Sequence, residues 1–176
     1  RGRIPEQTEF LEDGDHVMFG EQSGSFLYNP GHTLGAITYL FGEAAFTGDT
    51  LFAAGCGRLF EGTSEQMYDS LNNCIGILPD HTQLYFGHEY TENNLRFALS
   101  VESGNTEINK KLADVKGLRC SGKFSTPTTI AEEKQTNPFL RCGSPEIKGA
   151  VNSNDPSNDM TEKEVFRRLR EMKDVF

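Results

Sequence analysis

Three short stretches each place a side chain that can bind a metal directly after, or between, runs typical of β-strands. These stretches are GHT at residues 31–33, TGDT at 47–50 and GHEY at 87–90. A side chain that leaves a strand end in a glycine-containing turn is held by the sheet and yet faces a cleft. Taken singly, each stretch is more typical of a turn or a helix cap. Together, in this order, they are a much more specific signal than any one of them alone.

The elements that must hold these side chains form a sheet-bearing part up to about residue 90. Strands are predicted at residues 16–19, 25–28, 36–41, 44–47 and 83–86. A two-residue turn, Gly42 and Glu43, joins two of them into a hairpin. Residues 51–60 are predicted to be a loop, and a helix begins after the capping pattern at 63–66 and ends before Pro79. This order of elements predicts a sheet with helices packed on it.

Beyond residue 90 the sequence pattern becomes helical. Helices are predicted at residues 92–101, at 106–116 before Gly117, at 129–134 and after a cap at Thr161. Residues 142–158 are rich in Gly, Ser, Pro, Asn and Asp, which is typical of a long loop. The expected fold class is therefore α/β. A sheet domain at residues 1–90 would be followed by a small all-helical domain at residues 91–176.

Composition and charge exclude several classes of partner. The chain has 17 Lys and Arg against 26 Asp and Glu, a formal charge of −9, without a run of basic residues. Nucleic acids and anionic membranes require a clustered positive field, so neither is an expected partner. The apolar runs are far shorter than the about 20 residues that cross a bilayer. We expect a cytoplasmic monomer with reduced cysteines, and the sequence leaves a mitochondrial or plastid location open.

In this order, the motifs resemble those of the metallo-β-lactamase superfamily and, within it, glyoxalase II, the hydroxyacylglutathione hydrolase family. Residues 30–35 are similar to the family's third metal-histidine motif, residues 46–52 to its metal-bridging aspartate motif, and residues 87–91 to its last metal-histidine motif. The likeness continues through residues 54–58, 61–63, 137–141 and 170–174. It implies the C-terminal half of a metallo-β-lactamase-like domain, followed by a helical glutathione-binding domain.

One motif of that family has no counterpart in this chain. The family's first metal motif has the form THxHxDH, and no two of the four histidines here stand two residues apart. Because this motif precedes the matched region, the expectation is that the chain is the C-terminal part of such an enzyme. His32, Asp49 and His88 would then give each of two ions at most two protein donors, below the three of catalytic zinc sites. We therefore expect weak metal binding and little hydrolysis.

The resemblance implies a metal-dependent thioester hydrolase. Its substrate would be S-2-hydroxyacylglutathione, such as S-lactoylglutathione, and its products glutathione and a 2-hydroxy acid. It would use two divalent metal ions, zinc first, with iron and manganese also suited to these ligands. His32 and His88 would be metal ligands, and Asp49 would be both a metal ligand and the catalytic carboxylate.

Glutathione carries two carboxylates, so its pocket should supply cations and hydroxyl groups. The family pattern assigns this role to Arg58, Tyr90, Arg170 and Lys173, and Phe60 can line the same pocket. Without the resemblance, we would interpret basic residues in the last turns of a helix as stabilising the helix through its dipole. Phe60 would equally suit the core.

Two other functions remain open from the sequence. A related sulfur dioxygenase branch uses a single iron in a similar fold, but the long helical extension after residue 90 disfavours it. A non-catalytic remnant that binds glutathione-like ligands is the second alternative. His16 and His81 receive no role in any of these functions.

Overall fold

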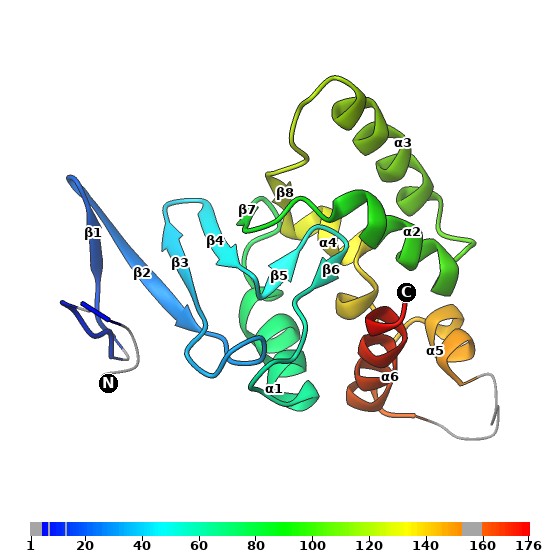
Figure 1. The fold of residues 1–176 in the computed structure, drawn as a ribbon, viewed down its shortest axis with the longest axis horizontal. Helices are drawn as coiled ribbons and strands as arrows, with labels where there is room; N and C mark the ends of the chain where they lie inside the picture. Colours follow the sequence, from blue (N-terminus) through cyan, green and yellow to red (C-terminus); the bar gives the residue numbers. More distant parts are fainter. Residues whose placement is uncertain (1–4, 7, 13, 153–159) are drawn as a thin grey trace.

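The computed structural model describes residues 5–6, 8–12, 14–152 and 160–176 (Figure 1). Its main sheet has six strands in the order β1-β2-β3-β4-β7-β8. These strands are β1 (Val17–Phe19), β2 (Gln22–Tyr28), β3 (Ile37–Phe41), β4 (Ala44–Gly48), β7 (Gln83–Phe86) and β8 (Thr128–Thr129). A separate hairpin pairs β5 (Leu51–Phe52) with β6 (Gly55–Cys56). Figure 1 shows this hairpin between the sheet and the helices α2 and α6.

Strand direction brings the ends of three strands to one edge of the sheet. β1 to β4 pair in antiparallel fashion, and β7 runs parallel to β4. Consequently β2, β4 and β7 point the same way, and their carboxyl ends share an edge. Gly48 of β4 pairs with Phe86 of β7, so the turns that follow these two strands are neighbours.

Six α-helices accompany the sheet in the described part of the chain. They are α1 (Ser64–Asp69), α2 (Thr91–Val101), α3 (Thr106–Cys120), α4 (Ile130–Thr136), α5 (Pro145–Val151) and α6 (Glu162–Asp174). α1 continues as a π-helix, Ser70–Ile75, and Pro138–Leu140 form a 3-10 helix. Capping boxes at Thr63 and Thr161 start α1 and α6, which confirms the two predicted helix starts. None of these helices is both long and apolar enough to cross a membrane, as far as the described residues go.

The predicted long loop over residues 142–158 is wrong in its first part. α5 begins with a proline at its first turn, where the missing N–H costs nothing. Ile147 of this helix is completely buried in the main hydrophobic core, so packing outweighs the loop-like composition. Residues 153–159 lie outside the described part of the chain.

The predicted end of the helix at Gly117 is also wrong, because α3 continues to Cys120. A glycine inside an exposed helix costs only about 1 kcal/mol, which does not end it. Gly122 has a φ of +73° and provides the left-handed residue after the helix. Residues 51–60, predicted to be a loop, contain the β5–β6 hairpin.

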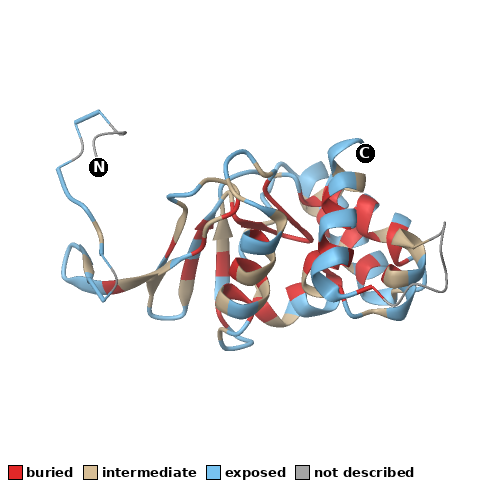
Figure 2. Ribbon diagram, turned by 90° about the horizontal axis from the view of Figure 1, so that it is seen from below, coloured by how far each residue is buried: buried red, intermediate tan, exposed pale blue. Residues whose placement is uncertain are grey.

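The main hydrophobic core joins the sheet-bearing part to the helical part. It includes Leu71 and Leu84 from the first part and Phe139, Phe166 and Leu169 from the second. Figure 2 shows the buried residues concentrated around the helices, whereas the amino-terminal strands are mostly intermediate or exposed. The division into domains at residues 90 and 91 stays a prediction. The helical part also contributes β8, which pairs with β7.

Candidate metal and substrate site

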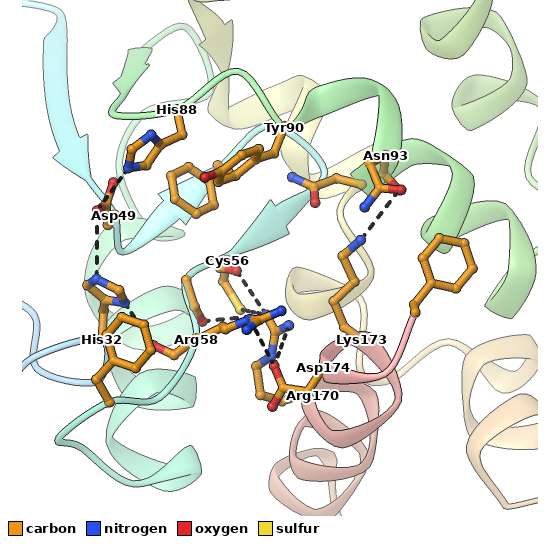
Figure 3. Close-up of a pocket in the computed structure, with 15 residues that line it drawn as sticks. His32, Asp49, Cys56, Arg58, His88, Tyr90, Asn93, Arg170, Lys173 and Asp174 are labelled. Atoms are coloured by element: carbon orange, nitrogen blue, oxygen red, sulfur yellow. Dashed lines mark hydrogen bonds and ion pairs between the residues drawn. The ribbon is translucent and has the colours of Figure 1, made fainter.

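The three predicted metal ligands lie together at the carboxyl ends of β2, β4 and β7 (Figure 3). His32 lies in the loop after β2, Asp49 in the turn after β4, and His88 directly after β7. Nε2 of His88 is 3.4 Å from Asp49 Oδ2, and Nε2 of His32 is 3.7 Å from the same oxygen. In Figure 3 the carboxylate lies between the two imidazoles.

These nitrogen–oxygen distances suit shared metal coordination. An N–H···O hydrogen bond spans about 2.7–3.2 Å, which is shorter than either distance. Two ligands of one tetrahedral zinc ion, with bonds of about 2.0–2.1 Å, lie about 3.3–3.4 Å apart. The 3.4 Å distance from His88 to Asp49 matches this spacing, and the 3.7 Å distance from His32 is slightly longer. Among the described residues, no group of three or more His, Cys, Asp or Glu side chains is placed to hold an ion.

The ring of His32 is oriented by the backbone of the loop after β6. Its Nδ1 lies 2.8 Å from the carbonyl oxygen of Arg58. A proton on Nδ1, donated to this oxygen, leaves the lone pair of Nε2 directed toward Asp49, as a metal ligand requires. Phe60 packs on the ring with 4.9 Å between ring centroids, and its backbone N–H donates to the carbonyl of His32.

Two glycines allow the backbone to approach the predicted ligands. A Cβ atom at Gly57 would overlap the carbonyl oxygen of Asp49 and lie 2.9 Å from His32 Nδ1. A Cβ atom at Gly87 would overlap Oδ1 of Asp49. A side chain at Gly57 would require a shift of the turn that carries Asp49, and one at Gly87 would displace the Asp49 carboxylate.

A cavity of about 560 Å³ opens beside the three ligands. The eight site residues predicted from the sequence all line it: His32, Asp49, Arg58, Phe60, His88, Tyr90, Arg170 and Lys173. Other lining residues were not predicted: Phe52, Cys56, Gly57, Asn93, Asn94, Asp174 and Phe176. Asp174 could have been found from its position four residues after Arg170 on one helix. His81 instead lies on the exposed surface, 3.6 Å from Glu43, and His16 is also exposed.

Arg170 is the most buried cation of the site, with 4% of its surface exposed. Its Nη1 donates to the carbonyl of Cys56 at 2.9 Å, and its Nη2 donates to Asp174 Oδ1 at 3.1 Å. Its Nε has no hydrogen-bond partner among the described residues. Arg170 therefore ties the terminal helix α6 to the loop after β6.

Lys173 and Arg58 are the cations with accessible charge. Lys173 Nζ lies between the rings of Phe97 and Phe176, 5.2 and 4.9 Å from their centroids. Burial, and then the neighbouring charge of Arg170, lower the pKa of Lys173 to about 8, so the ammonium is still mostly protonated at neutral pH. The side chain of Arg58 is 64% exposed, with its Nε 3.7 Å from Asp174.

The remaining cavity wall is aromatic and carries one thiol. Tyr90 stacks on His88 with 5.1 Å between centroids, and Phe52 packs edge-on against both rings. Burial raises the pKa of the Cys56 thiol. This thiol therefore stays protonated and is a poor nucleophile.

Comparison with known proteins identifies the family. A family model described as "Hydroxyacylglutathione hydrolase C-terminus" matches residues 89–176. The hydroxyacylglutathione hydrolase of Trichodesmium erythraeum is 48% identical over 183 residues, an alignment that covers 100% of this chain and 68% of that protein. The chain belongs to the hydroxyacylglutathione hydrolase family. The resemblance of its motifs to hydroxyacylglutathione hydrolases is thereby confirmed.

Solved structures show the fold that this hydroxyacylglutathione hydrolase family member shares. ETHE1 from Myxococcus xanthus is 30% identical, with a TM-score of 0.54 over 94% of this chain and 59% of that chain. A metallo-β-lactamase from Staphylococcus aureus, 20% identical, has a TM-score of 0.56 over 98% and 45%. TTHA1623 in a di-iron-bound form is 25% identical, with a TM-score of 0.50 over 77% and 50%. The predicted α/β fold of the metallo-β-lactamase type is confirmed.

Proposed function

We propose that this chain binds S-2-hydroxyacylglutathione and takes part in the metal-dependent hydrolysis of its thioester, with S-lactoylglutathione as substrate. One observation carries the proposal. A single cavity has His32, Asp49 and His88 on one side and accessible cations on the other. A glutathione thioester has matching groups, namely a carbonyl carbon with a thiolate leaving group and two carboxylates. The family to which the chain belongs supports the same reaction.

The predicted ligands would hold two divalent ions, His32 and His88 one each, with Asp49 between them. Such ions, when bound, supply an activated water molecule and stabilise negative charge on the carbonyl oxygen. The carbonyl of Arg58 keeps His32 in the required tautomer and orientation. Water adds to the thioester carbon and the carbon–sulfur bond breaks, which yields a 2-hydroxy acid and glutathione. Because a thiol has a pKa of about 8.5, the thiolate leaves without a strong general acid.

Three side chains line the cavity with a charge or a hydroxyl group that can contact the glutathione portion, and one of them, Lys173, also donates to the carbonyl of Asn93 at 3.4 Å. Arg58 and Lys173 offer charge to its carboxylates, and the half-exposed Tyr90 offers a hydroxyl group. Phe60 is 70% exposed and can cover the apolar parts of the ligand. Arg170 would position these side chains rather than contact the ligand first, because its hydrogen bonds hold Asp174 and the loop that carries Arg58. We keep all five residues in the proposed substrate site.

Metal content provides a first prediction. With two protein donors for each ion in the described residues, zinc should dissociate during dialysis, because catalytic zinc sites keep three protein ligands. Metal analysis after dialysis should therefore find well under two ions per chain. Two tightly held ions would contradict this part of the proposal. Iron stays a candidate alongside zinc and manganese, since histidine and carboxylate ligands suit all three.

The pKa of Lys173 provides a second prediction. Its protonated form attracts a carboxylate, so affinity for S-methylglutathione should fall as the pH rises through about 8. Between pH 7 and pH 9 the protonated fraction of such a group falls about tenfold, and affinity should follow that fraction. Calorimetric titration at several pH values measures this fall. K173R keeps the charge over the whole range and should flatten the profile, and an unchanged profile in K173R would refute the assignment.

A titration and an enzyme assay together separate the possible functions. Glutathione is titrated into the chain by calorimetry, and thioester hydrolysis is measured with and without added zinc. Binding with zinc-dependent hydrolysis supports the proposal, whereas binding without turnover supports a non-catalytic glutathione-binding protein. Oxygen uptake with glutathione persulfide would support the sulfur dioxygenase alternative. Relatives that cover the whole chain at 48% identity favour the hydrolase.

A further inference from the structure

Glu133 of α4 is a completely buried carboxylate that contacts the hairpin beside the cavity. Its Oε2 accepts a hydrogen bond of 2.7 Å from the backbone N–H of Ala54, in the turn between β5 and β6. Glu133 does not line the cavity itself. It therefore cannot contact a substrate there, and any effect on the site must pass through the hairpin.

The turn that Glu133 contacts needs partners from elsewhere in the chain. Ala54 has a φ of +55°, a left-handed conformation that residues with a Cβ rarely adopt. The whole turn is buried, so its polar backbone groups must be paired within the protein. Asn137, which follows α4, donates to the carbonyls of Phe52 and Gly55 at 3.3 and 3.1 Å. The segment around α4 thus holds both sides of this turn.

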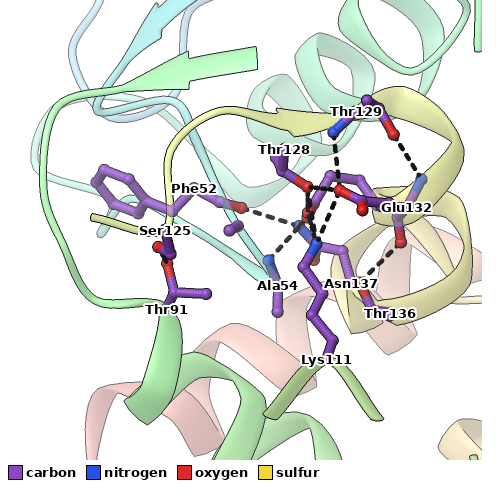
Figure 4. Close-up of polar contacts among 12 residues, drawn as sticks. Phe52, Ala54, Thr91, Lys111, Ser125, Thr128, Thr129, Glu132, Thr136 and Asn137 are labelled. Atoms are coloured by element: carbon purple, nitrogen blue, oxygen red, sulfur yellow. Dashed lines mark hydrogen bonds and ion pairs between the residues drawn. The ribbon is translucent and has the colours of Figure 1, made fainter. Parts of the chain in front are cut away.

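Four donors converge on the two oxygens of Glu133, and Figure 4 shows the groups around them. Oε2 accepts from the Ala54 N–H and, at 2.9 Å, from Asn137 Nδ2. Oε1 accepts from Lys111 Nζ and Thr128 Oγ1, both at 2.8 Å. A carboxylate satisfies all four donors, and Lys111 balances its charge.

The hairpin and the loop after it touch both predicted metal-binding imidazoles. Phe52 packs edge-on against His88 with 6.1 Å between centroids. Six residues later, the carbonyl of Arg58 lies 2.8 Å from Nδ1 of His32. A displaced hairpin would therefore disturb the contacts that orient both rings.

We propose that Glu133 is a positioning residue of this site. By holding Ala54 in its left-handed conformation, it fixes the β5–β6 hairpin and, through Phe52 and Arg58, the directions of His88 and His32. The part of this inference that concerns zinc affinity rests on the proposed function. The part that concerns the hairpin and the His32 ring does not.

Glu133→Met tests the inference, because methionine has a similar volume and no strong acceptor. We expect faster amide hydrogen exchange at Ala54 and Gly57 and loss of the His32 Nδ1–H signal in NMR spectra. Zinc affinity should fall about tenfold, the lower end of the range for groups that orient metal ligands. Glu133→Gln should restore all three readouts. Its amide oxygen still accepts from Ala54, while Lys111 can turn to Glu132, 3.7 Å away.

Glu102→Met is the matched control. Glu102 is 3% exposed, and its carboxylate accepts from Asn105, Arg141 and Ser144 and not from the hairpin. This variant should therefore lose stability and keep all three readouts. The inference fails if folded Glu133→Met behaves like the parent chain, or if Glu102→Met changes the same readouts. Should Glu133→Met not fold, Asn137→Ala must speed exchange at Ala54 instead. If the parent chain binds no zinc, the proposed function fails, and exchange and the His32 signal still decide this inference.

Discussion

Replacing Asp49 by asparagine should weaken zinc binding more than any other single change in the site. Oδ2 of Asp49 is the atom that faces Nε2 of both His32 and His88. A neutral amide loses the negative charge that both half-sites share. The loss should exceed the about 10- to 100-fold typical of groups that only orient ligands. Competition against a chelator of known affinity measures it.

Asp80→Asn is the matched control for this experiment. The side chain of Asp80 is 69% exposed and pairs with Lys134 on the surface. The control should keep the zinc affinity of the parent chain. If Asp49→Asn also keeps it, the carboxylate does not connect the two imidazoles and the metal site proposed here is wrong.

Gly57→Ala should produce the second large effect. Its added Cβ would overlap the carbonyl oxygen of Asp49 and press on the ring of His32. Relief requires movement of a buried backbone, so we expect the free energy of unfolding to fall by about 2–3 kcal/mol, as overpacking does elsewhere. In the protein that remains folded, glutathione and zinc should both bind more weakly. Chemical denaturation and calorimetry measure the two effects separately.

Gly35→Ala serves as its control, because a Cβ atom there meets no heavy atom within 4 Å. This variant should keep both stability and ligand binding. Equal behaviour of Gly57→Ala and Gly35→Ala would show that the turn carrying Asp49 can move away at no cost. The close packing that orients the ligands would then be unimportant.

The placement of the proposed metal ligands at strand ends could be predicted from the sequence, and the resemblance of their motifs to a known family implied their role. Each ligand follows a strand in the sequence, and strands that point the same way end at one edge of the sheet. The strands predicted to end at residues 28, 47 and 86 end at Tyr28, Gly48 and Phe86 in the structure. The convergence of His32, Asp49 and His88 also depends on the parallel pairing of β4 with β7, which the strand patterns alone do not predict.

The other wall of the cavity could not be predicted in the same way. The β5–β6 hairpin depends on Ala54 in a left-handed conformation, where sequence patterns favour glycine or asparagine. The conformation is held by Glu133, 79 residues further along the chain. The secondary-structure propensities of residues near Ala54 cannot predict a hydrogen bond to a residue so distant in the sequence. The prediction of a loop at residues 51–60 therefore missed the β5–β6 hairpin, the element that we propose orients both imidazoles.

The sequence also did not predict which cations of the site are already hydrogen-bonded within the protein. Arg170 and Lys173 are three residues apart and share a face of α6, as their spacing predicts. Arg170 is nevertheless buried and donates to Cys56 and Asp174. Lys173 is only partly buried, and its ammonium group lies beside two rings and makes one long hydrogen bond, 3.4 Å, to the carbonyl of Asn93. Which of these two cations can contact a ligand depends on how far segments distant in the sequence bury each of them.

Hydrolysis of S-lactoylglutathione, followed in parallel for the parent chain and Asp49→Asn with and without added zinc, tests the proposed site most directly. We expect slow hydrolysis by the parent chain that requires zinc and exceeds the rate with zinc alone. In Asp49→Asn the rate should fall to that of zinc alone. Equal rates for the two proteins, or hydrolysis that a chelator does not affect, would contradict the assignment of this cavity as a metal-dependent thioesterase site.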